Sequence, residues 1–264
     1  MTTHSNATHQ RGLLATINAA VWALLPAALR RWLNLKRQAL RRWPPVGMVE
    51  FGSLRRITPI SQSFGLDRGL CIDRYYIEHF LGQHAGDVQG QVLEVGDDIY
   101  TTRFGREQVT GSDVLHVTED NARATIVADL TQADQIPSDV YDCIVLTQTL
   151  QFIYDVRKAV QTLYRILKPN GVLLVTCSGI NRISRYDMDR WGEYWRFTTL
   201  SASRLFEEFF PPSDVTVQGY GNVLAAVAFL HGLAVSELSQ QELDYCDSDY
   251  EILIGVRVVK PETR

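Results

Sequence analysis

The chain has 264 residues, of which 45% are hydrophobic and 21% are charged, and its formal net charge is −4. These values are typical of a folded soluble protein, often a single α/β domain at this length, and they exclude extensive disorder. The negative balance gives no reason to expect nucleic acid as a partner, because duplex binding relies on a cationic surface. Four cysteines without a CxxC pair exclude the usual zinc-site and disulfide patterns, so we expect a reducing, cytoplasmic location.

The first segment of the sequence differs from the rest. An apolar, alanine-rich stretch over residues 13–29 contains Asn18 and Pro26 and is short for a membrane span. Six cations follow before the first acid, Glu50: Arg30, Arg31, Lys36, Arg37, Arg41 and Arg42. A signal peptide would carry its charges in front, followed by a cleavage site. Three interpretations stay open: a helical extension docked on the main domain, an amphipathic helix contacting an anionic membrane through residues 13–43, and a transmembrane span.

Pro44-Pro45 ends this basic helix, and a loop-like stretch over residues 46–69, rich in glycine, leads to the main domain. We therefore expect a helical N-terminal extension and linker over residues 1–69 and a catalytic domain over residues 70–264.

Alternating hydrophobic periods begin at residue 72 and predict the elements of the main domain. Helices are expected over residues 72–81, 155–168 and 223–233, and extended segments over 91–95, 109–113, 124–130, 142–147, 172–177, 215–218 and 252–259. The segment 167–171 should end the second of these helices and turn the chain. Strand, helix and strand in succession indicate a doubly wound α/β sheet covered on both faces. The last strand follows a long connection, which favours antiparallel pairing.

Several expected strand ends carry groups suited to a nucleoside ligand, which binds outside the carboxyl ends of such strands. Gly96 lets the backbone approach a ligand closely, and Asp113 can accept bonds from two ribose hydroxyls. Asp129 can accept from an adenine amino group while Leu130 covers the ring, and Gln148 follows the fourth strand. Each residue alone also fits a turn or a helix cap. Their order along one series is what makes the pattern informative.

This series resembles the class I S-adenosylmethionine-dependent methyltransferase family over about residues 70–260. The matching stretches are 92–96, 109–113, 127–130, 141–150 and 167–175, where Leu167-Lys168-Pro169-Asn170-Gly171 is close to the family's Leu-Lys-Pro-Gly-Gly turn. The resemblance implies a Rossmann-like seven-stranded sheet, mostly parallel with an antiparallel last strand. It also implies S-adenosylmethionine as cofactor and a small-molecule substrate.

By that resemblance, Glu94 and Gly96 would hold the methionine end of the cofactor, Asp113 its ribose, and Asp129 and Leu130 its adenine. The full implied set is Tyr76, Glu94, Gly96, Asp97, Asp98, Asp113, Val114, Asp129, Leu130 and Gln148.

One departure matters, because Asp98 and Tyr100 replace the second and third glycines of the family's first motif. Asp97 and Asp98 would attract the cofactor's ammonium and repel its carboxylate, a repulsion that Arg74 or Arg103 would offset. The alternative is a non-catalytic scaffold that has lost the cofactor.

The segments 73–78 and 194–198 also resemble bacterial members associated with glycosyltransferases and surface-polysaccharide synthesis. That likeness implies methyl transfer to a hydroxyl of a sugar or glycosylated small molecule, which for a membrane-bound pathway would be lipid-linked. The alternative is O-, N- or C-methylation of a non-sugar natural product.

A hydroxyl acceptor needs a base, and the candidates are His116, Glu193 and Tyr194. Substrate-binding candidates are Arg74, Trp191, Trp195 and Arg196, of which the aromatic residues would stack on a ring and Arg196 would bind an acid group. Core packing explains the aromatic residues equally well, and a structural role explains His116. Four acids, Asp97, Asp98, Glu119 and Asp120, would suit a hard metal ion, but solvated turns account for them and no metal is expected.

Overall fold

A computed structural model describes residues 25–41 and 44–262, and this part of the chain divides into two units at Arg56–Ile57. The first unit contains helix α2 (Ala27–Arg41), the helix expected in the N-terminal extension, and a 3₁₀ turn over Gly52–Leu54. The apolar residues 13–24 lie outside the described residues. None of the helices in the described ranges combines the length and the hydropathy needed to cross a bilayer.

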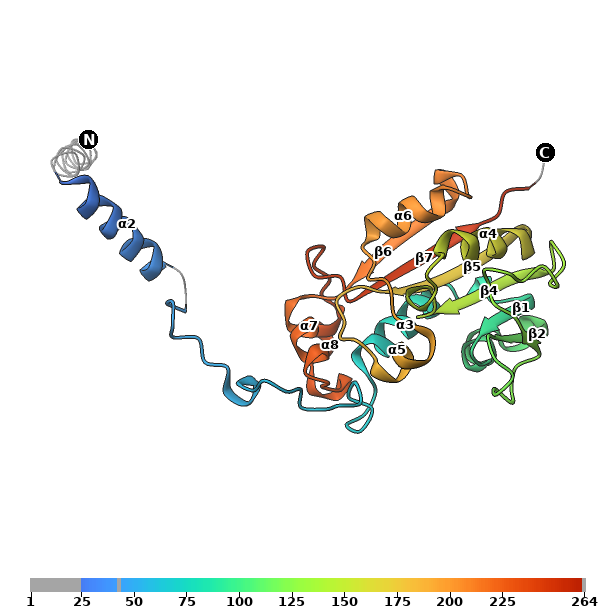
Figure 1. Cartoon of the computed structure of the whole chain (residues 1–264), viewed down its shortest axis with the longest axis horizontal. Helices are drawn as coiled ribbons and strands as arrows, with labels where there is room; N and C mark the ends of the chain where they lie inside the picture. The colour runs from blue at the N-terminus through green and yellow to red at the C-terminus, as the bar shows by residue number, and fades with distance from the viewer. Residues whose placement is uncertain (1–24, 42–43, 263–264) are drawn as a thin grey trace, which may run out of the picture. The chain divides into compact units, whose positions relative to one another are not determined.

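The second unit is built on a seven-stranded sheet with the order β3-β2-β1-β4-β5-β7-β6 (Figure 1). The strands are β1 (Gly90–Val95), β2 (Val109–His116), β3 (Ile126–Val127), β4 (Tyr141–Thr147), β5 (Leu167–Ser178), β6 (Val215–Tyr220) and β7 (Leu253–Val259). Strands β1 to β5 pair in parallel, whereas β7 is antiparallel to both of its neighbours. The predicted fold class is therefore confirmed, including the antiparallel last strand.

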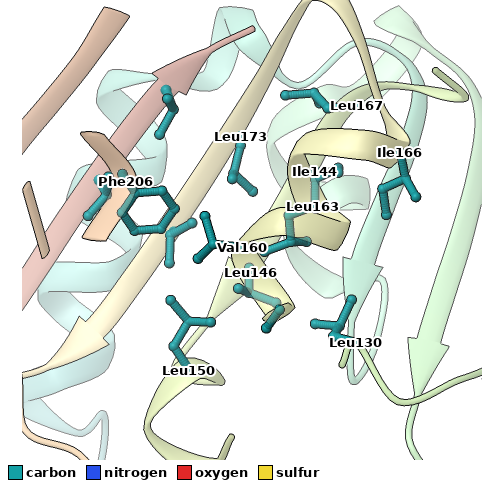
Figure 2. Packing of buried hydrophobic residues seen from close by; sticks show 14 of the residues in the cluster. Leu130, Ile144, Leu146, Leu150, Val160, Leu163, Ile166, Leu167, Leu173 and Phe206 are labelled. Carbon is teal, nitrogen blue, oxygen red and sulfur yellow. The ribbon is translucent and has the colours of Figure 1, made fainter. Parts of the chain in front are cut away.

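Both faces of the sheet are buried, as the continuous apolar strands predict. On β4, Ile144 and Leu146 face a core that contains α4 (Val156–Ile166) and α6 (Thr199–Glu207). The alternate residues Cys143 and Val145 face a second core, formed with α3 (Ile72–Gln83) and α7 (Val223–Leu230). Figure 2 shows Val160, Leu163 and Ile166 of the first core packed over the strands. The sheet thus holds its strand ends rigidly between two helical layers.

Helix α4 and the turn after it follow the sequence signals closely. The Asp155 carboxylate accepts a bond from the Lys158 amide (3.2 Å) and so caps the helix. The helix ends at Ile166, and Asn170 adopts a left-handed φ of 63°. Residues 168–171 loop out of β5, because the ladder passes from Leu167 directly to Val172. The predicted turn is present, although β5 begins before it.

The bounds of several elements differ from the sequence-based expectation, and some helices were not expected. The third strand is limited to Ile126–Val127 rather than 124–130, because it pairs only with β2 and then enters the turn at Asp129. Helix α7 ends at Leu230, before Gly232 with its φ of 69°. No helix lies between β2 and β4 in residues 117–140, and the β1–β2 connection contains only short π-helical and 3₁₀ turns. Helices α5 (Arg185–Trp191), α6 and α8 (Gln240–Asp244) were not predicted.

Candidate active site

A cavity of about 980 Å³ lies at the carboxyl ends of β1, β2 and β4, within the second unit. Small-molecule sites span roughly 300–1,000 Å³, so a cavity of this size has room for a cofactor and a second molecule. Ten predicted site residues line it: Arg74, Gly96, Asp97, His116, Asp129, Leu130, Gln148, Trp191, Glu193 and Tyr194. Seven others do not: Tyr76, Glu94, Asp98, Asp113, Val114, Trp195 and Arg196.

Gly96 presents bare backbone to this cavity directly after β1. Its φ is 97°, which L side chains rarely adopt, and no heavy atom lies within 4 Å of where a Cβ would stand. Its backbone carbonyl accepts a bond from Nδ2 of the Asn121 side chain (2.6 Å), and its backbone amide donates to the Leu115 carbonyl (2.9 Å). A ligand can therefore approach the chain here more closely than any side chain would permit, as the first motif predicts.

The residue at the motif's third glycine position, Tyr100, has a structural use. Its ring is buried in the second core, and its hydroxyl accepts a bond from Nη1 of Arg74 (2.8 Å). Arg74 and Asp97 both line the cavity, so a cation stands on the same wall as the acid. Asp73 also lines the cavity, and burial raises the pKa of its carboxyl. The altered motif keeps the open backbone of its first glycine and adds a fixed guanidinium group.

Glu94 is the first correction to the predicted site. Its side chain is 1% exposed and accepts bonds from the amides of Tyr100 (3.1 Å) and Thr101 (2.7 Å). Burial raises the pKa of this carboxyl to about 7. Glu94 therefore stabilises the turn behind the glycine loop, and it does not reach the methionine end of a ligand. Asp98 also lies outside the cavity, where it pairs with Arg123 (2.9 Å).

Asp113 is the second correction, because it does not end its strand. The β1–β2 ladder continues to Leu115, and β2 ends at His116. The Asp113 carboxylate instead accepts bonds from Nε2 of Gln91 (2.9 Å) and Oγ1 of Thr125 (2.8 Å). In this placement Asp113 does not line the cavity, and His116 takes the position at the strand end. Val114 and Tyr76 are likewise core residues rather than ligand contacts.

The two residues predicted to contact adenine, Asp129 and Leu130, follow β3 and both line the cavity. The Asp129 carboxylate accepts bonds from the amide (2.8 Å) and hydroxyl (2.9 Å) of Thr131, and both bonds go to Oδ1. Among the described residues no other bond uses this carboxylate, so Oδ2 is available to a ligand amino group. Leu130 is 3% exposed and supplies an apolar surface.

A pair of glutamines lines the cavity beyond β4. Gln148 has a left-handed φ of 48°, and its amide donates to the Thr176 carbonyl (2.9 Å). Its Oε1 accepts a bond from Nε2 of Gln151 (2.7 Å), which is 3% exposed. Gln151 was not among the residues predicted from the sequence. Its position three residues after Gln148, at the start of an aromatic segment, is the signal that could have identified it.

Glu193 lines the cavity and also makes structural bonds. One carboxylate oxygen pairs with Nη2 of Arg196 (2.7 Å), and the other accepts a bond from the Ser184 amide (2.9 Å). Its side chain is only 3% exposed. Glu193 therefore fastens the segment 184–196, and its role as a base stays a prediction. Arg196 is used in the same pair and does not line the cavity.

Of the predicted aromatic residues, Trp191 and Tyr194 line the cavity, where Tyr154 and Tyr186 join them, whereas Trp195 does not line it. Tyr194 meets Tyr154 edge-on with ring centroids 5.3 Å apart, and both line the cavity. Trp195 stacks behind Tyr154 (6.0 Å), and its Nε1 donates to the Ile153 carbonyl (3.0 Å). Trp191 meets the His116 ring at 5.8 Å, which joins α5 to the end of β2. A base role for His116 or Tyr194 stays a prediction.

Metal-ligating side chains were also considered. Within residues 25–41 and 44–262, no three His, Cys, Asp or Glu side chains are grouped so that they would hold a metal ion. Asp120 accepts a bond from the Thr118 hydroxyl. The four cysteines are free, and burial raises the pKa of the Cys71 thiol to about 11.

Comparison with known proteins connects this cavity to a sequence family. Residues 94–175 match the family described as a methyltransferase domain. The chain is 31% identical over 86 residues to the ubiquinone/menaquinone biosynthesis C-methyltransferase UbiE of Pectobacterium carotovorum. It is 29% identical over 87 residues to the UbiE protein of a Marinomonas strain. Each match covers 33% of this chain and 32% of the relative, so the chain spans about a third of the length of these relatives.

Two solved structures share features of the fold. One is a SAM-dependent methyltransferase from Archaeoglobus fulgidus, with 10% identity, a TM-score of 0.49, and coverage of 71% of this chain and 94% of that one. The other is the N-methyltransferase NodS from Bradyrhizobium japonicum in complex with S-adenosyl-L-homocysteine, with 13% identity, a TM-score of 0.48, and coverage of 77% and 95%. The family match over residues 94–175 runs from β1 into β5, so the strand ends that border the cavity at Gly96, Asp129 and Gln148 lie within a stretch similar to the methyltransferase domain family.

Proposed function

We propose that this protein transfers a methyl group from S-adenosylmethionine to a hydroxyl of a sugar or glycosylated small molecule. The observation that carries the cofactor part is the convergence of Gly96, Asp129 and Leu130 on one cavity, although they follow different strands. The open backbone at Gly96 supports it further, because that space has no structural occupant.

The residues present fit the cofactor's functional groups. Gly96 and Asp97 would hold the amino acid part, where Arg74 would pair with its carboxylate and Asp97 with its ammonium. Asp129 would accept a bond from the adenine amino group, and Leu130 would cover the ring. The cavity offers no acid in place of Asp113, so ribose recognition would fall to the end of β2.

When bound, the cofactor would supply an electrophilic methyl group, which would pass to the acceptor oxygen while the electron pair of the broken carbon–sulfur bond stays on sulfur. The hydroxyl proton would pass to a base, for which His116 and Tyr194 are candidates on the cavity wall. The chain's own task is then alignment and exclusion of water. Glu193 and Arg196 hold the segment 184–196 in place, and Trp191 and Tyr194 close the cavity wall. A methyl donor that is already activated needs little else from the protein.

The acceptor part rests on the chemistry of the remaining wall. Four aromatic side chains line it: Tyr154, Tyr186, Trp191 and Tyr194. Two acids lie among them, Asp155 and Asp187. Aromatic faces that stack on a ring, next to acceptors for hydroxyl groups, suit a sugar.

A second candidate is C-methylation of a flat ring, such as a hydroquinone. The curated relatives are named as C-methyltransferases of ubiquinone and menaquinone biosynthesis, and the same aromatic side chains would stack on a planar ring.

Two measurements test the proposal. Calorimetry with S-adenosylmethionine and S-adenosylhomocysteine should give saturable 1:1 binding, and no binding would favour a non-catalytic scaffold. Transfer of a tritiated methyl group is then measured with methyl glycosides and with a hydroquinone. Transfer to a glycoside is expected, and transfer to the hydroquinone alone would replace the sugar by the second candidate.

A further inference from the structure

Two buried amide side chains on the cavity wall each carry an oxygen without a hydrogen-bond donor. These atoms are Oε1 of Gln151 and Oδ1 of Asn181. The amide nitrogens are both engaged, on Oε1 of Gln148 (2.7 Å) and on Oγ of Ser178 (3.1 Å), which fixes the orientation of the two groups.

Such an arrangement is unfavourable without a ligand. A buried acceptor that lacks a donor costs roughly 1–3 kcal/mol, and native proteins leave few of them. Gln151 and Asn181 both line the cavity, so each of them borders the space that a bound molecule would occupy. A hydrogen-bond donor on that molecule would satisfy the unpaired oxygens.

The position of the two amides separates them from the proposed cofactor site. Gln151 follows β4 and Asn181 follows β5, whereas Gly96 and Asp129 follow β1 and β3. The strand order places β4 and β5 on the other side of β1 from β2 and β3. The carbonyl of Gln151 also accepts a bond from the Tyr194 amide (2.8 Å), so this residue is joined to the aromatic wall.

We propose that Gln151, assisted by Asn181, determines acceptor specificity by accepting hydrogen bonds from hydroxyl groups of the acceptor. The proposal rests on the proposed function and deepens it. A neutral amide oxygen selects a donor and gives nothing to a carbonyl or an ether. The acceptor is therefore a molecule with free hydroxyl groups, a condition that a hydroquinone also meets, and the choice of a sugar is taken from the proposed function.

The test combines a protein change with a ligand change. Gln151→Leu keeps the side chain's size and removes the acceptor, while Gln161→Leu, exposed on α4 outside the cavity, is the control. Methyl transfer is measured with methyl glycosides of glucose, galactose, mannose and rhamnose and with their monodeoxy analogues. Wild type and control should discriminate against one deoxy analogue by roughly tenfold to a hundredfold in kcat/KM, mainly through KM. In Gln151→Leu this discrimination should disappear, while the Kd for S-adenosylmethionine changes less than about twofold.

Unfolding in urea gives a second readout. Gln151→Leu removes an unsatisfied buried acceptor but also removes the donor to Oε1 of Gln148, so the two effects offset and the ligand-free variant should be about as stable as wild type. A residue with only a structural role would lower the unfolding midpoint. Gln151→Glu retains an acceptor oxygen and should keep the sugar discrimination, which provides a reading if the leucine variant does not fold.

The outcomes separate this proposal from the function on which it rests. Absence of cofactor binding by wild type overturns both. Cofactor binding without transfer to any glycoside overturns this proposal, and so does equal discrimination by wild type and Gln151→Leu.

Discussion

At the scale of single residues, Gly96 combines a backbone conformation and an open space that bear on different measurements. Gly96→Ala introduces a Cβ at a φ of 97°, which should cost ~1–2 kcal/mol of unfolding free energy. The methyl group occupies the space assigned to the cofactor, so affinity for S-adenosylmethionine should fall roughly tenfold or more. Urea unfolding and calorimetry measure the two effects separately.

The matched control is Gly86→Ala. Gly86 also has no atom within 4 Å of a built Cβ, but its φ is not in the left-handed region and it lies outside the cavity. Stability and affinity should both be retained. If Gly96→Ala bound the cofactor as wild type does, the glycine loop would have no part in binding.

Glu94 makes a prediction about pH. Its pKa in the folded protein, about 7, lies above its ordinary value of 4.5, so the folded state binds this proton more tightly than the unfolded state. The contribution to stability is complete below about pH 4.5 and is lost as the pH rises through about 7. Relative to Glu94→Gln, wild type should therefore lose ~1–3 kcal/mol between pH 5 and pH 8. Parallel stability curves for the two proteins across this range, from urea titrations, would contradict the assignment.

At the scale of elements, the segment 184–196 depends on the pair between Glu193 and Arg196. Glu193→Gln leaves Arg196 without its partner and weakens the bond to the Ser184 amide at the start of α5. We expect kcat/KM for the acceptor to fall roughly tenfold, with cofactor affinity retained and the pH profile unchanged in shape. Loss of a limb of the pH–rate profile would instead restore Glu193 as the catalytic base.

Helix α2 has the composition of an interfacial helix. It carries five cations and no acid, and Leu29, Trp32 and Leu33 fall on one face at helical spacing. We expect the full-length protein to sediment with vesicles containing phosphatidylserine and not with neutral vesicles. Arg30→Glu should reduce this binding roughly tenfold. Arg204→Glu, at an exposed position of α6, changes the net charge equally and should have little effect. Equal reduction by both would point to net charge rather than to the helix.

At the scale of the whole molecule, the cavity belongs entirely to the second unit. Its lining residues lie between Phe64 and Tyr194, and the amide of Ile60 donates to the His231 carbonyl (2.8 Å). A chain of residues 57–264 should therefore fold and bind S-adenosylmethionine with a Kd within about twofold of the full chain.

A chain of residues 70–264 is the contrasting variant. It follows the boundary expected from the sequence, but it removes Phe64 and Leu66 from the cavity wall, and it should bind more weakly. Equal affinity of the two fragments would show that the boundary at residue 69 is the functional one.

The sequence by itself determined the succession of the seven strands, the helices α3, α4 and α7, and the residues next to strand ends at Gly96, Asp129 and Gln148. These follow from local patterns: a period of two in strands, 3.6 in helices, and glycine where a chain turns. Asp113 shows the limit of such patterns. A polar residue such as Asp113 within an extended segment suggests that the strand ends there. Only the pairing between β1 and β2 shows that the strand continues to His116.

Tertiary structure decided which polar groups are already satisfied. Glu94 and Glu193 are carboxylates of the kind found in active sites. The oxygens of Glu94 accept bonds from the amides of Tyr100 and Thr101. Those of Glu193 bind the Ser184 amide and Arg196. Gln151 stands at the start of an aromatic segment, but only the folded structure shows that its side-chain oxygen is left without a donor. Hydrogen bonds between residues far apart in the chain depend on three-dimensional proximity, which local periodicity does not encode, so they separate structural groups from those free to bind a ligand.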